Sequence, residues 1–347
     1  MLFRSQPALG RPAGTKIAAD VSRRVGIVTK TDSIGNLAMQ ATGIQRGESH
    51  RVIFARLVIS HLACLGVFFV PVTPELVLAA VLGYVARMFF VEAGAHRYFS
   101  HRAYKTSRAF QALLAWGVAA SGQRGALWWA AHHRHHHRTS DRAGDPHSPI
   151  TSASFWHAHM GWLVRPENPH TDLDAVKDLA RYPELVWLNR THMLWPILLL
   201  VVTVLLGAYT PFFGHDGLGT SAAVWAFFVP TVLSLHGIFV VNSLTHGGKL
   251  GRWHRRRFAT NDHTTNAWWL AIPTLGAAWH NNHHRYMNAA RAGFYRWELD
   301  LSYVMLRLLA QVHLVWDLHE VPSAVLDEGH TLESQPMPLS DLTELQR

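Results

Sequence analysis

The chain has 347 residues, of which 49% are hydrophobic and 16% are charged. Charged residues make up roughly 25% of ordinary soluble domains, so this composition is typical of a membrane protein. The formal net charge of +9 would suit either nucleic acid or an anionic membrane surface. Because the basic residues flank apolar segments and no nucleic-acid module is recognisable, we favour the membrane and expect no nucleic-acid partner.

Residues 1–50 are polar and basic, and they lack the apolar core of roughly 7–15 residues that a secretory signal needs. We predict that they form a disordered basic tail. The single cysteine, Cys64, lies in an apolar run. One cysteine forms no internal disulfide and builds no cysteine-ligated zinc or iron–sulfur site.

Four apolar stretches follow, each long enough, or nearly so, to cross about 30 Å of hydrocarbon as a helix. They cover residues 52–70, 75–94, 194–210 and 222–243. Only the sequence PVTP separates the first two, so we expect these two to form a helical hairpin. Arg56, His61 and Arg87 lie within them and must face the bundle or reach an end of the span.

The charges of the connecting segments predict an orientation. Residues 71–74 and 211–221 contain no Lys or Arg, whereas residues 95–192 and both ends of the chain are rich in them. By the positive-inside rule, the termini and the large middle segment lie in the cytoplasm. We therefore predict an all-α integral membrane protein with four transmembrane helices and a cytoplasmic helical cap. Its membrane domain covers residues 51–320, with the cap formed by residues 95–192 and 244–320.

Other segments are assigned by pattern and length. Residues 109–120 are apolar but too short to span, which suits a re-entrant or interfacial helix. Residues 173–190 are amphipathic, are interrupted by Pro183, and suit a membrane surface. Residues 294–318 are predicted to be a helix packed on the cap, with a fifth span as the alternative. Residues 321–347 are acidic and are predicted to be a loose tail.

The most unusual feature is histidine, of which the chain has 25. One cluster, HRYFSH, has the spacing HxxxxH, and two others, HRHHH and HNNHH, have the spacing HxxHH. Residues i, i+3 and i+4 share a face of an α-helix, so we expect each HxxHH to direct three imidazoles at one place. The clustered histidines are His96, His101, His133, His136, His137, His280, His283 and His284.

The HxxxxH pair differs, because at about 100° per residue its members stand roughly 140° apart on an α-helix. His96 and His101 would then flank a site at a helix end or serve two neighbouring metals. Eight clustered imidazoles are too many for one tetrahedral zinc ion with its four ligands. Two octahedral metals fit the number better, although imidazole suits iron, zinc, copper and nickel alike.

The ordered boxes HxxxxH, HxxHH and HxxHH on a protein with four predicted spans resemble the membrane fatty-acid desaturases, most closely the stearoyl-CoA (delta-9) type. The resemblance covers roughly residues 50–320. It is carried by GAHRYFSH, WWAAHHRHHHR with DPH after it, HMGWL, NSLTH and WHNNHHRY. It implies two iron ions, with O2 as co-substrate, held by the eight histidines and by His246. It also implies that Asn242 holds a metal through water, and Asp145 and His147 are candidates to support the ligands.

The activity implied by the resemblance is the introduction of a cis double bond into a saturated fatty-acyl chain. An alkane C–H bond is far too weakly acidic for a side-chain base, so the metal carries the hard step and the protein positions the chain. We expect a dry, bent tunnel that selects the reacting carbon. Candidates for its wall are Trp128, Trp129, Trp268 and Trp269, with an interfacial aromatic belt as the alternative.

Two departures from the family pattern concern the acyl carrier. Ala131 and His132 stand where the family commonly has Arg-Asp, and Ala277 and Ala278 interrupt a common Gly-Glu-Gly-Trp-His. The choice between acyl-CoA, acyl-carrier protein and phospholipid therefore stays open, as do chain length and double-bond position.

The electrons are expected from a separate protein, since the chain has one cysteine and no His-Pro-Gly-Gly of a fused cytochrome b5 domain. The basic run RWHRRR could dock an acidic ferredoxin, rubredoxin or cytochrome b5-like donor, with anionic membrane lipid as the alternative partner. The candidate docking residues are Arg252, Arg255, Arg256 and Arg257.

Two other functions stay open. A membrane di-iron hydroxylase or monooxygenase would use similar boxes and differ in its product. A non-catalytic metal-binding protein, such as a transporter, would place its histidines within the spans. Here the clusters fall at the predicted cytoplasmic ends of the spans, which favours an enzyme.

Overall fold

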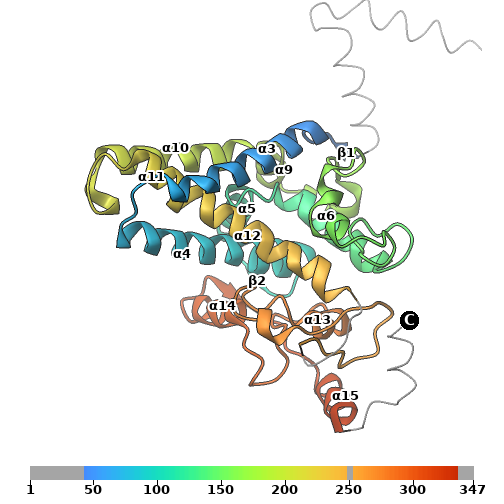
Figure 1. Cartoon of the computed structure of the whole chain (residues 1–347). Coiled ribbons are helices and arrows are strands. Elements are labelled where there is room, and N and C mark those ends of the chain that lie inside the picture. Colours follow the sequence, from blue (N-terminus) through green and yellow to red (C-terminus); the bar gives the residue numbers. More distant parts are fainter. Residues whose placement is uncertain (1–42, 248–252, 335–347) are drawn as a thin grey trace, which may run out of the picture. The chain divides into compact units, whose positions relative to one another are not determined.

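The computed structural model describes residues 43–247 and 253–334 (Figure 1). Most of the predicted N-terminal tail, Arg252 of RWHRRR and the last thirteen residues lie outside the described part. The described chain is mostly helical and contains two short antiparallel strand pairs. Strand β1 (Ile44–Gln45) pairs with β3 (Thr171–Asp172), and β2 (Lys105–Thr106) pairs with β4 (Val315–Trp316).

Three helices are long and apolar enough to cross a membrane: His50–Phe68, Pro74–Ser100 and Gly219–Thr245. The first joins α3 (His50–Cys64) to the 3-10 helix η1 (Leu65–Phe68), and the second joins α4 (Pro74–Phe89) to the π-helix η2 (Phe90–Ser100). The third comprises α11 (Gly219–Ala222), η6 (Ala223–Phe228), α12 (Val229–Val240) and η7 (Val241–Thr245). These helices agree with three of the predicted spans and make a multi-pass membrane protein.

The fourth predicted span corresponds to α10 (Leu194–Tyr209). This helix follows α9 (Pro183–Arg190) after a bend of 68°, and the two together meet the criterion of length and composition for a span. The protein therefore has three membrane-capable helices, or four if this bent pair counts as one. The short η5 (Pro211–Phe213) leads from α10 toward the last span.

The first two spans begin where the sequence supplies capping residues. The side chain of Ser49 accepts a hydrogen bond from the backbone N–H of Val52, and that of Thr73 accepts one from Leu76. Such hydroxyls satisfy backbone donors that the first turn of a helix leaves free. Pro74 adds a ring that suits the first helical position, because that position needs no backbone donor.

The last span packs against both of the first two, and Figure 1 shows α12 running between α3 and α4. The first two helices are joined by a short connection, as predicted, but their main shared neighbour is α12. The polar residues within them face the protein. His61 Nε2 lies 3.0 Å from Nε2 of His236 on α12, and the buried Arg87 donates to the carbonyl of Gly83.

The largest buried apolar cluster surrounds η2, the end of the second span. It includes Phe99 of η2, Leu114 of α5 (Arg108–Ala120), Leu127 of α6 (Ala126–Thr139) and Leu306 of α14 (Leu301–Gln311). This core fixes η2 and α6 side by side, and these two elements carry the first two histidine clusters. The shorter elements around it are α7 (Phe155–His159), η3 (Gly161–Val164), η4 (Asp174–Val176), α8 (Lys177–Ala180), η8 (Trp268–Leu270) and α13 (His280–Arg285).

Several of the predicted segments differ in extent from the observed elements. The segment 109–120 is helical as α5, and 173–190 is broken before Pro183 into η4, α8 and α9. Of 294–318, only α14 is helical, because Asp300 caps its start and β4 follows its end. With 11 residues, α14 is too short for the alternative of a fifth span.

The chain after residue 321 was predicted to be loose, but its described part forms the helix α15 (Ser323–Ser334). Val325 of this helix packs in a buried cluster with Phe258 and Phe294, and Glu328 pairs with Arg285 of α13. The acidic composition gave no sign of this helix, because few apolar residues dock it: Val325 is buried in the cluster and Leu326 packs against it.

Gly117 of α5 offers a test of this packing. A Cβ atom at Gly117 would stand 2.1 Å from the ring of Phe90, whereas one at Gly94 would meet Val118 at an ordinary 3.4 Å. We expect Gly117→Ala to destabilise the protein by about 1–3 kcal/mol through overpacking. Gly94→Ala should be close to neutral. Thermal unfolding in detergent measures both, and equal unfolding temperatures for the two variants would contradict the observed contact of α5 with η2.

Candidate metal centre

The π-helix η2 changes the geometry of the HxxxxH pair. In a π-helix the N–H of residue i+5 bonds to the C=O of residue i, so residues five apart come round to the same side. The N–H of His101 donates to the C=O of His96 at 3.3 Å, and the two ring centroids are 5.0 Å apart. The predicted separation of roughly 140°, which assumed an α-helix, is therefore wrong, and both imidazoles face one site.

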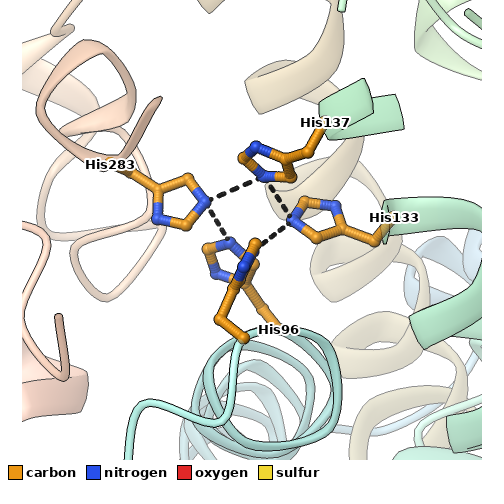
Figure 2. A group of neighbouring side chains, drawn as sticks. His96, His133, His137 and His283 are labelled. Atoms are coloured by element: carbon orange, nitrogen blue, oxygen red, sulfur yellow. Dashed lines mark hydrogen bonds between the residues drawn. The ribbon is translucent and has the colours of Figure 1, made fainter. Parts of the chain in front are cut away.

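The first group of convergent side chains is called site A. It contains five histidines, and one ligand nitrogen from each lies within 4.8 Å of all the others. Their Nε2 atoms are 2.9 Å apart for His96–His283 and His101–His133, 3.0 Å for His133–His137 and 3.1 Å for His137–His283. Figure 2 shows four of these rings facing one another. The site A residues are His96, His101, His133, His137 and His283.

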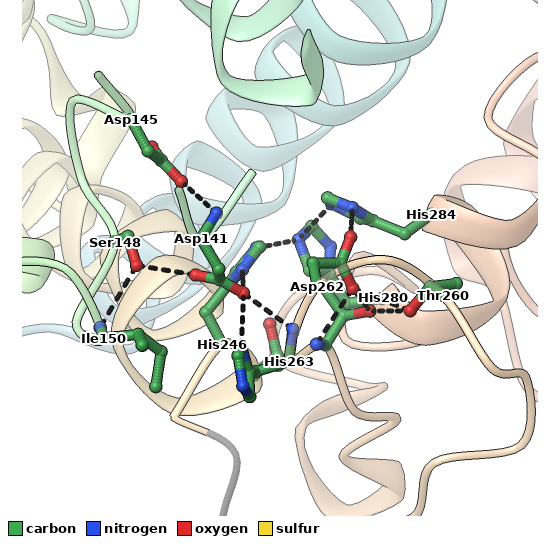
Figure 3. Close-up of polar contacts among 12 residues, drawn as sticks. Asp141, Asp145, Ser148, Ile150, His246, Thr260, Asp262, His263, His280 and His284 are labelled. Atoms are coloured by element: carbon green, nitrogen blue, oxygen red, sulfur yellow. Dashed lines mark hydrogen bonds and ion pairs between the residues drawn. The ribbon is translucent and has the colours of Figure 1, made fainter. Parts of the chain in front are cut away.

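The second group, site B, contains four histidines that meet the same criterion. The Nε2 atom of His280 lies 2.9 Å from that of His246 and 3.1 Å from that of His284 (Figure 3). The ring of His136 is centred 4.8 Å from that of His246. The site B residues are His136, His246, His280 and His284. The two sites thus collect all nine histidines that the sequence and the resemblance predicted as ligands.

Each HxxHH box is divided between the two sites, which corrects the expectation that its three imidazoles share one place. In α6, His133 and His137 face site A and His136 faces site B. In α13, His280 and His284 face site B and His283 faces site A. Residues i and i+4 differ by only about 40° around a helix, whereas i+3 and i+4 differ by about 100°. One box therefore supplies two rings to one site and one ring to the other.

Four carboxylates orient the rings by accepting hydrogen bonds from Nδ1. The pairs are Glu92 with His96 at 3.0 Å, Asp145 with His136 at 2.9 Å, Asp141 with His246 at 3.0 Å and Asp262 with His284 at 2.7 Å. A ring that donates its Nδ1 proton keeps a free lone pair on Nε2. The carboxylates thus direct Nε2 lone pairs toward the centre of each site.

These carboxylates are held in turn by other groups. Asp141 also accepts from the hydroxyl of Ser148 and the backbone N–H of His263 (Figure 3). Asp262 accepts from the hydroxyl of Thr264. Glu92 is buried beside the guanidinium of Arg97, which pairs with Asp300 at 3.0 Å. The Asp300 side chain also accepts a hydrogen bond at the start of α14. This chain of contacts therefore connects η2 to α14.

The spacing of the nitrogens fits metal ions. With a metal–nitrogen distance of about 2.1 Å, neighbouring ligands stand about 3.0 Å apart in an octahedron and about 3.4 Å apart in a tetrahedron. The observed contacts of 2.9–3.1 Å match the octahedral value. Among the described residues, the buried Nε2 of His136 has no hydrogen-bond partner. Because the Nδ1 proton of this ring is donated to Asp145, Nε2 carries a free lone pair. Both observations fit a nitrogen donor set for two metals.

The electrostatics also suit metal binding, which requires neutral imidazole. Burial, followed by neighbouring rings, holds the pKa of His133, His137 and His283 well below 6.5. For His284, burial outweighs the opposing effect of Asp262 and lowers the pKa to about 4. His246 is the exception: burial disfavours its charged form, but its hydrogen bond to Asp141 and the nearby carboxylate charges together raise its pKa.

A cavity reaches site A from the side of the spans. Its apolar wall includes Leu57 of α3 and Phe239 of α12, and it also touches His133, His147 and Asn242. Asn242 and His147 therefore both border this cavity. His147 packs 4.2 Å from the ring of His136, centroid to centroid, and with His136 and Asp145 it forms a further group able to hold an ion.

The four tryptophans predicted for the tunnel wall lie in different places. Trp129 lines the cavity. Trp128 is buried behind it, donates its ring N–H to the carbonyl of Asn168 and stacks on Trp162. Trp268 and Trp269 on η8 are 51% and 41% exposed and do not line this cavity.

The basic run RWHRRR does not form one exposed face. Arg257 pairs with Glu298 and donates to Asn282, and Arg256 donates to the carbonyl of Thr260. Arg255 is exposed, and Arg252 lies outside the described residues.

Sequence reasoning missed three carboxylates that orient ligands. Glu92 was readable, because it stands four residues before His96 on the same helix. Asp141 stands four residues before Asp145, whose DPH motif was noticed. Asp262 lies in an irregular segment, 22 residues from its partner His284, so no sequence spacing predicts their contact.

Membrane-capable helices joined to buried histidine groups able to hold metal ions are typical of metal-binding membrane proteins. The sequence model of the fatty acid desaturase family matches residues 44–314, and the chain belongs to that family. It is 34% identical over 255 residues to the hex-5-enoyl-[acyl-carrier protein] acetylenase of Moorena producens (strain JHB), covering 71% of this chain and 77% of that protein.

Two further relatives differ in the substrate that their names give. The sn-1 stearoyl-lipid 9-desaturase of Anabaena variabilis is 31% identical over 232 residues, covering 67% of this chain and 79% of that protein. The acyl-CoA C20 Delta5-desaturase of Anemone leveillei is 30% identical over 233 residues, covering 66% of this chain and 69% of that protein. Membership of the family makes this chain an oxidoreductase of lipid metabolism.

His135 provides a matched control for the metal ligands. It lies between site residues on α6, but it is exposed and its Nε2 contacts the carbonyl of Gly144. We expect His137→Ala to lower the metal retained by the purified protein, because site A loses one nitrogen, whereas His135→Ala should keep it. Elemental analysis after dialysis against a chelator measures both. Equal loss in two well-folded variants would show that the division of α6 into inward and outward histidines is wrong.

Proposed function

We propose that this protein is an oxygen-dependent di-iron desaturase that introduces a cis double bond, at delta-9, into a saturated fatty-acyl chain. The observation that carries the proposal is the pair of convergent histidine sites beside a cavity, in a chain of the fatty acid desaturase family. Sites A and B would each hold one iron, and Asn242 would hold one of them through water. Iron, when bound, supplies the oxidising power that breaks two unactivated C–H bonds with O2.

The overall reaction sets what the protein must deliver. One saturated acyl chain, O2, two electrons and two protons give one unsaturated chain and two water molecules. The side chains need not abstract hydrogen, since their part is to hold the metals and to fix the acyl chain. Leu57 and Phe239 line the cavity near His133, so an acyl chain there would exclude water from the reacting carbons.

The membrane arrangement belongs to the same proposal. Four spans would carry a cytoplasmic cap, with both termini on the cytoplasmic side, because the basic residues gather in the segments outside the spans. The membrane domain would cover residues 51–320. The bent pair α9 and α10 supplies the fourth span, and both histidine sites would then lie on the cytoplasmic side.

We further propose that the electron donor docks over a polar cleft on the cap. The cleft has a volume of about 490 Å³ and is lined by His137 of site A and His284 of site B. Arg138 and Arg142 are exposed at its edge. An acidic ferredoxin, rubredoxin or cytochrome b5-like protein would find complementary charge there, next to one ligand of each metal. The cleft replaces RWHRRR as the centre of the docking face, since Arg255 is the only exposed arginine of that run among the described residues.

Iron content and lipid products test the proposed reaction together. Purified protein should approach two irons per chain, and host lipids should gain a cis-monounsaturated acid when the protein is expressed. His284→Ala should remove the product, because site B loses a ligand that Asp262 orients. Mass spectrometry locates the double bond. A hydroxylated product would favour the membrane hydroxylase instead, and one metal per chain after iron reconstitution would contradict two sites.

Charge reversal tests the docking face. We expect Arg138→Glu combined with Arg142→Glu to raise the apparent KM for the donor more than it changes kcat. Turnover should also fall as salt rises, since the Debye length shortens from roughly 8 Å at 0.15 M to 3 Å at 1 M. Arg255→Glu, away from the cleft, is the matched control and should have the smaller effect. A larger effect of Arg255→Glu would return the docking site to RWHRRR.

A further inference from the structure

Arg124 is a buried cation on the wall of the cavity that reaches His133. It stands in the connection between α5 and α6, lines the cavity and is 3% exposed. Nη2 donates to the carbonyl of Pro169 at 2.6 Å, and Cζ lies 4.5 Å from the centre of the Trp128 ring. Nε and Nη1 have no hydrogen-bond partner among the described residues. Two of its three nitrogens are therefore unsatisfied in a buried place, where an unpaired guanidinium is costly.

The charges around Arg124 do not cancel. The charged groups that act on it are the Glu48 carboxylate and the Arg56 guanidinium. Glu48 lies 3.4 Å from Arg56 and also accepts a hydrogen bond from His192 at 2.9 Å. One carboxylate thus serves two guanidinium groups, which leaves one excess positive charge. Burial lowers the pKa of Arg124 to about 10, so this group stays protonated at neutral pH.

The backbone holds Arg124 in this position at some cost. Its φ of 71° lies in the left-handed region, which residues other than glycine seldom adopt. Gly47 packs against it so closely that a Cβ atom there would stand 2.7 Å from Nη2 of Arg124. The strained backbone of Arg124 and the close approach of Gly47 thus hold in place a cation whose charge the described residues do not fully balance.

We propose that Arg124 binds an oxyanion at the head of the acyl substrate, a carboxylate or a phosphate, while the apolar chain runs along the cavity toward His133. The inference rests on the proposed function and narrows its substrate class to acyl chains with an anionic head. A guanidinium donates charge-assisted N–H hydrogen bonds to a carboxylate or phosphate, and Nε and Nη1 of Arg124 are both without a partner among the described residues. A neutral alcohol or ester would leave the excess charge uncompensated.

Equilibrium binding without turnover tests this proposal. The full-length protein in non-ionic detergent, with no electron donor present, is titrated with palmitate, 1-palmitoyl lysophosphatidic acid and hexadecanol. We expect at least one of the acids to bind about tenfold or more tightly than the alcohol, because a charge-assisted hydrogen bond is lost with the alcohol. Tight binding of palmitate alone would identify a carboxylate head, and tight binding of the lysophosphatidic acid alone a phosphate head.

Three variants give this test its controls. Arg124→Gln keeps a side chain with a Cβ at the strained position and should abolish the preference for acids. Glu48→Gln removes the competing carboxylate and should strengthen acid binding. Arg190→Gln removes an exposed arginine on α9 and should change nothing. If Arg124→Gln does not fold, two results still test the proposal. These are the stronger acid binding expected of Glu48→Gln and the comparison of acid with alcohol in the unaltered protein. Equal binding of acids and alcohol by the unaltered protein would overturn the proposal.

The result is separable from the proposed desaturation. Binding needs neither iron nor O2, so an acid preference that depends on Arg124 would stand even if no unsaturated product formed. Conversely, desaturation by a protein that shows no acid preference would reject the role of Arg124 and leave the proposed function intact.

Discussion

The structure depends on bringing nine imidazole nitrogens together in two places with their lone pairs facing inward. Such an arrangement is repulsive by itself, so other parts of the fold must enforce it. Carboxylates on Nδ1 fix four of the rings, and these carboxylates are held by hydroxyls, backbone N–H groups and, for Glu92, by Arg97. The apolar core around η2 and α6 then keeps the helices in place. Both groups of histidines are able to hold metal ions, and metal binding would offset the repulsion.

The π-helices that end two of the spans serve this convergence. The second span ends in the π-helix η2, which turns His96 and His101 to one side, and the last span ends in the π-helix η7, directly before His246. Departures from α-helical geometry are weaker than regular turns and recur where function requires a particular direction of side chains. Both occur at the ends of spans that point toward the same metal centre.

In our proposals the metal centre has two approaches with different chemistry. The cavity is largely apolar, carries Arg124 on its wall and meets site A at His133. The cleft is polar, has Arg138 and Arg142 on its edge and meets both sites at His137 and His284. Because His133 and His137 are one helical turn apart on α6, this helix would separate the acyl chain from the electron donor while supplying ligands between them.

The sequence by itself indicated the class of the fold, three of the spans and the eight clustered histidines, because hydropathy and helical spacing are local properties. The ninth histidine, His246, came from the family resemblance. It did not determine how the histidines divide between two sites. That division follows from the hydrogen-bond pattern of η2 and from the 100° between neighbouring residues of α6 and α13, which matter only once three segments meet. Asp262 and Arg124 likewise acquired a role only from tertiary contacts, since each acts on residues distant in the chain or on a cavity that several helices enclose.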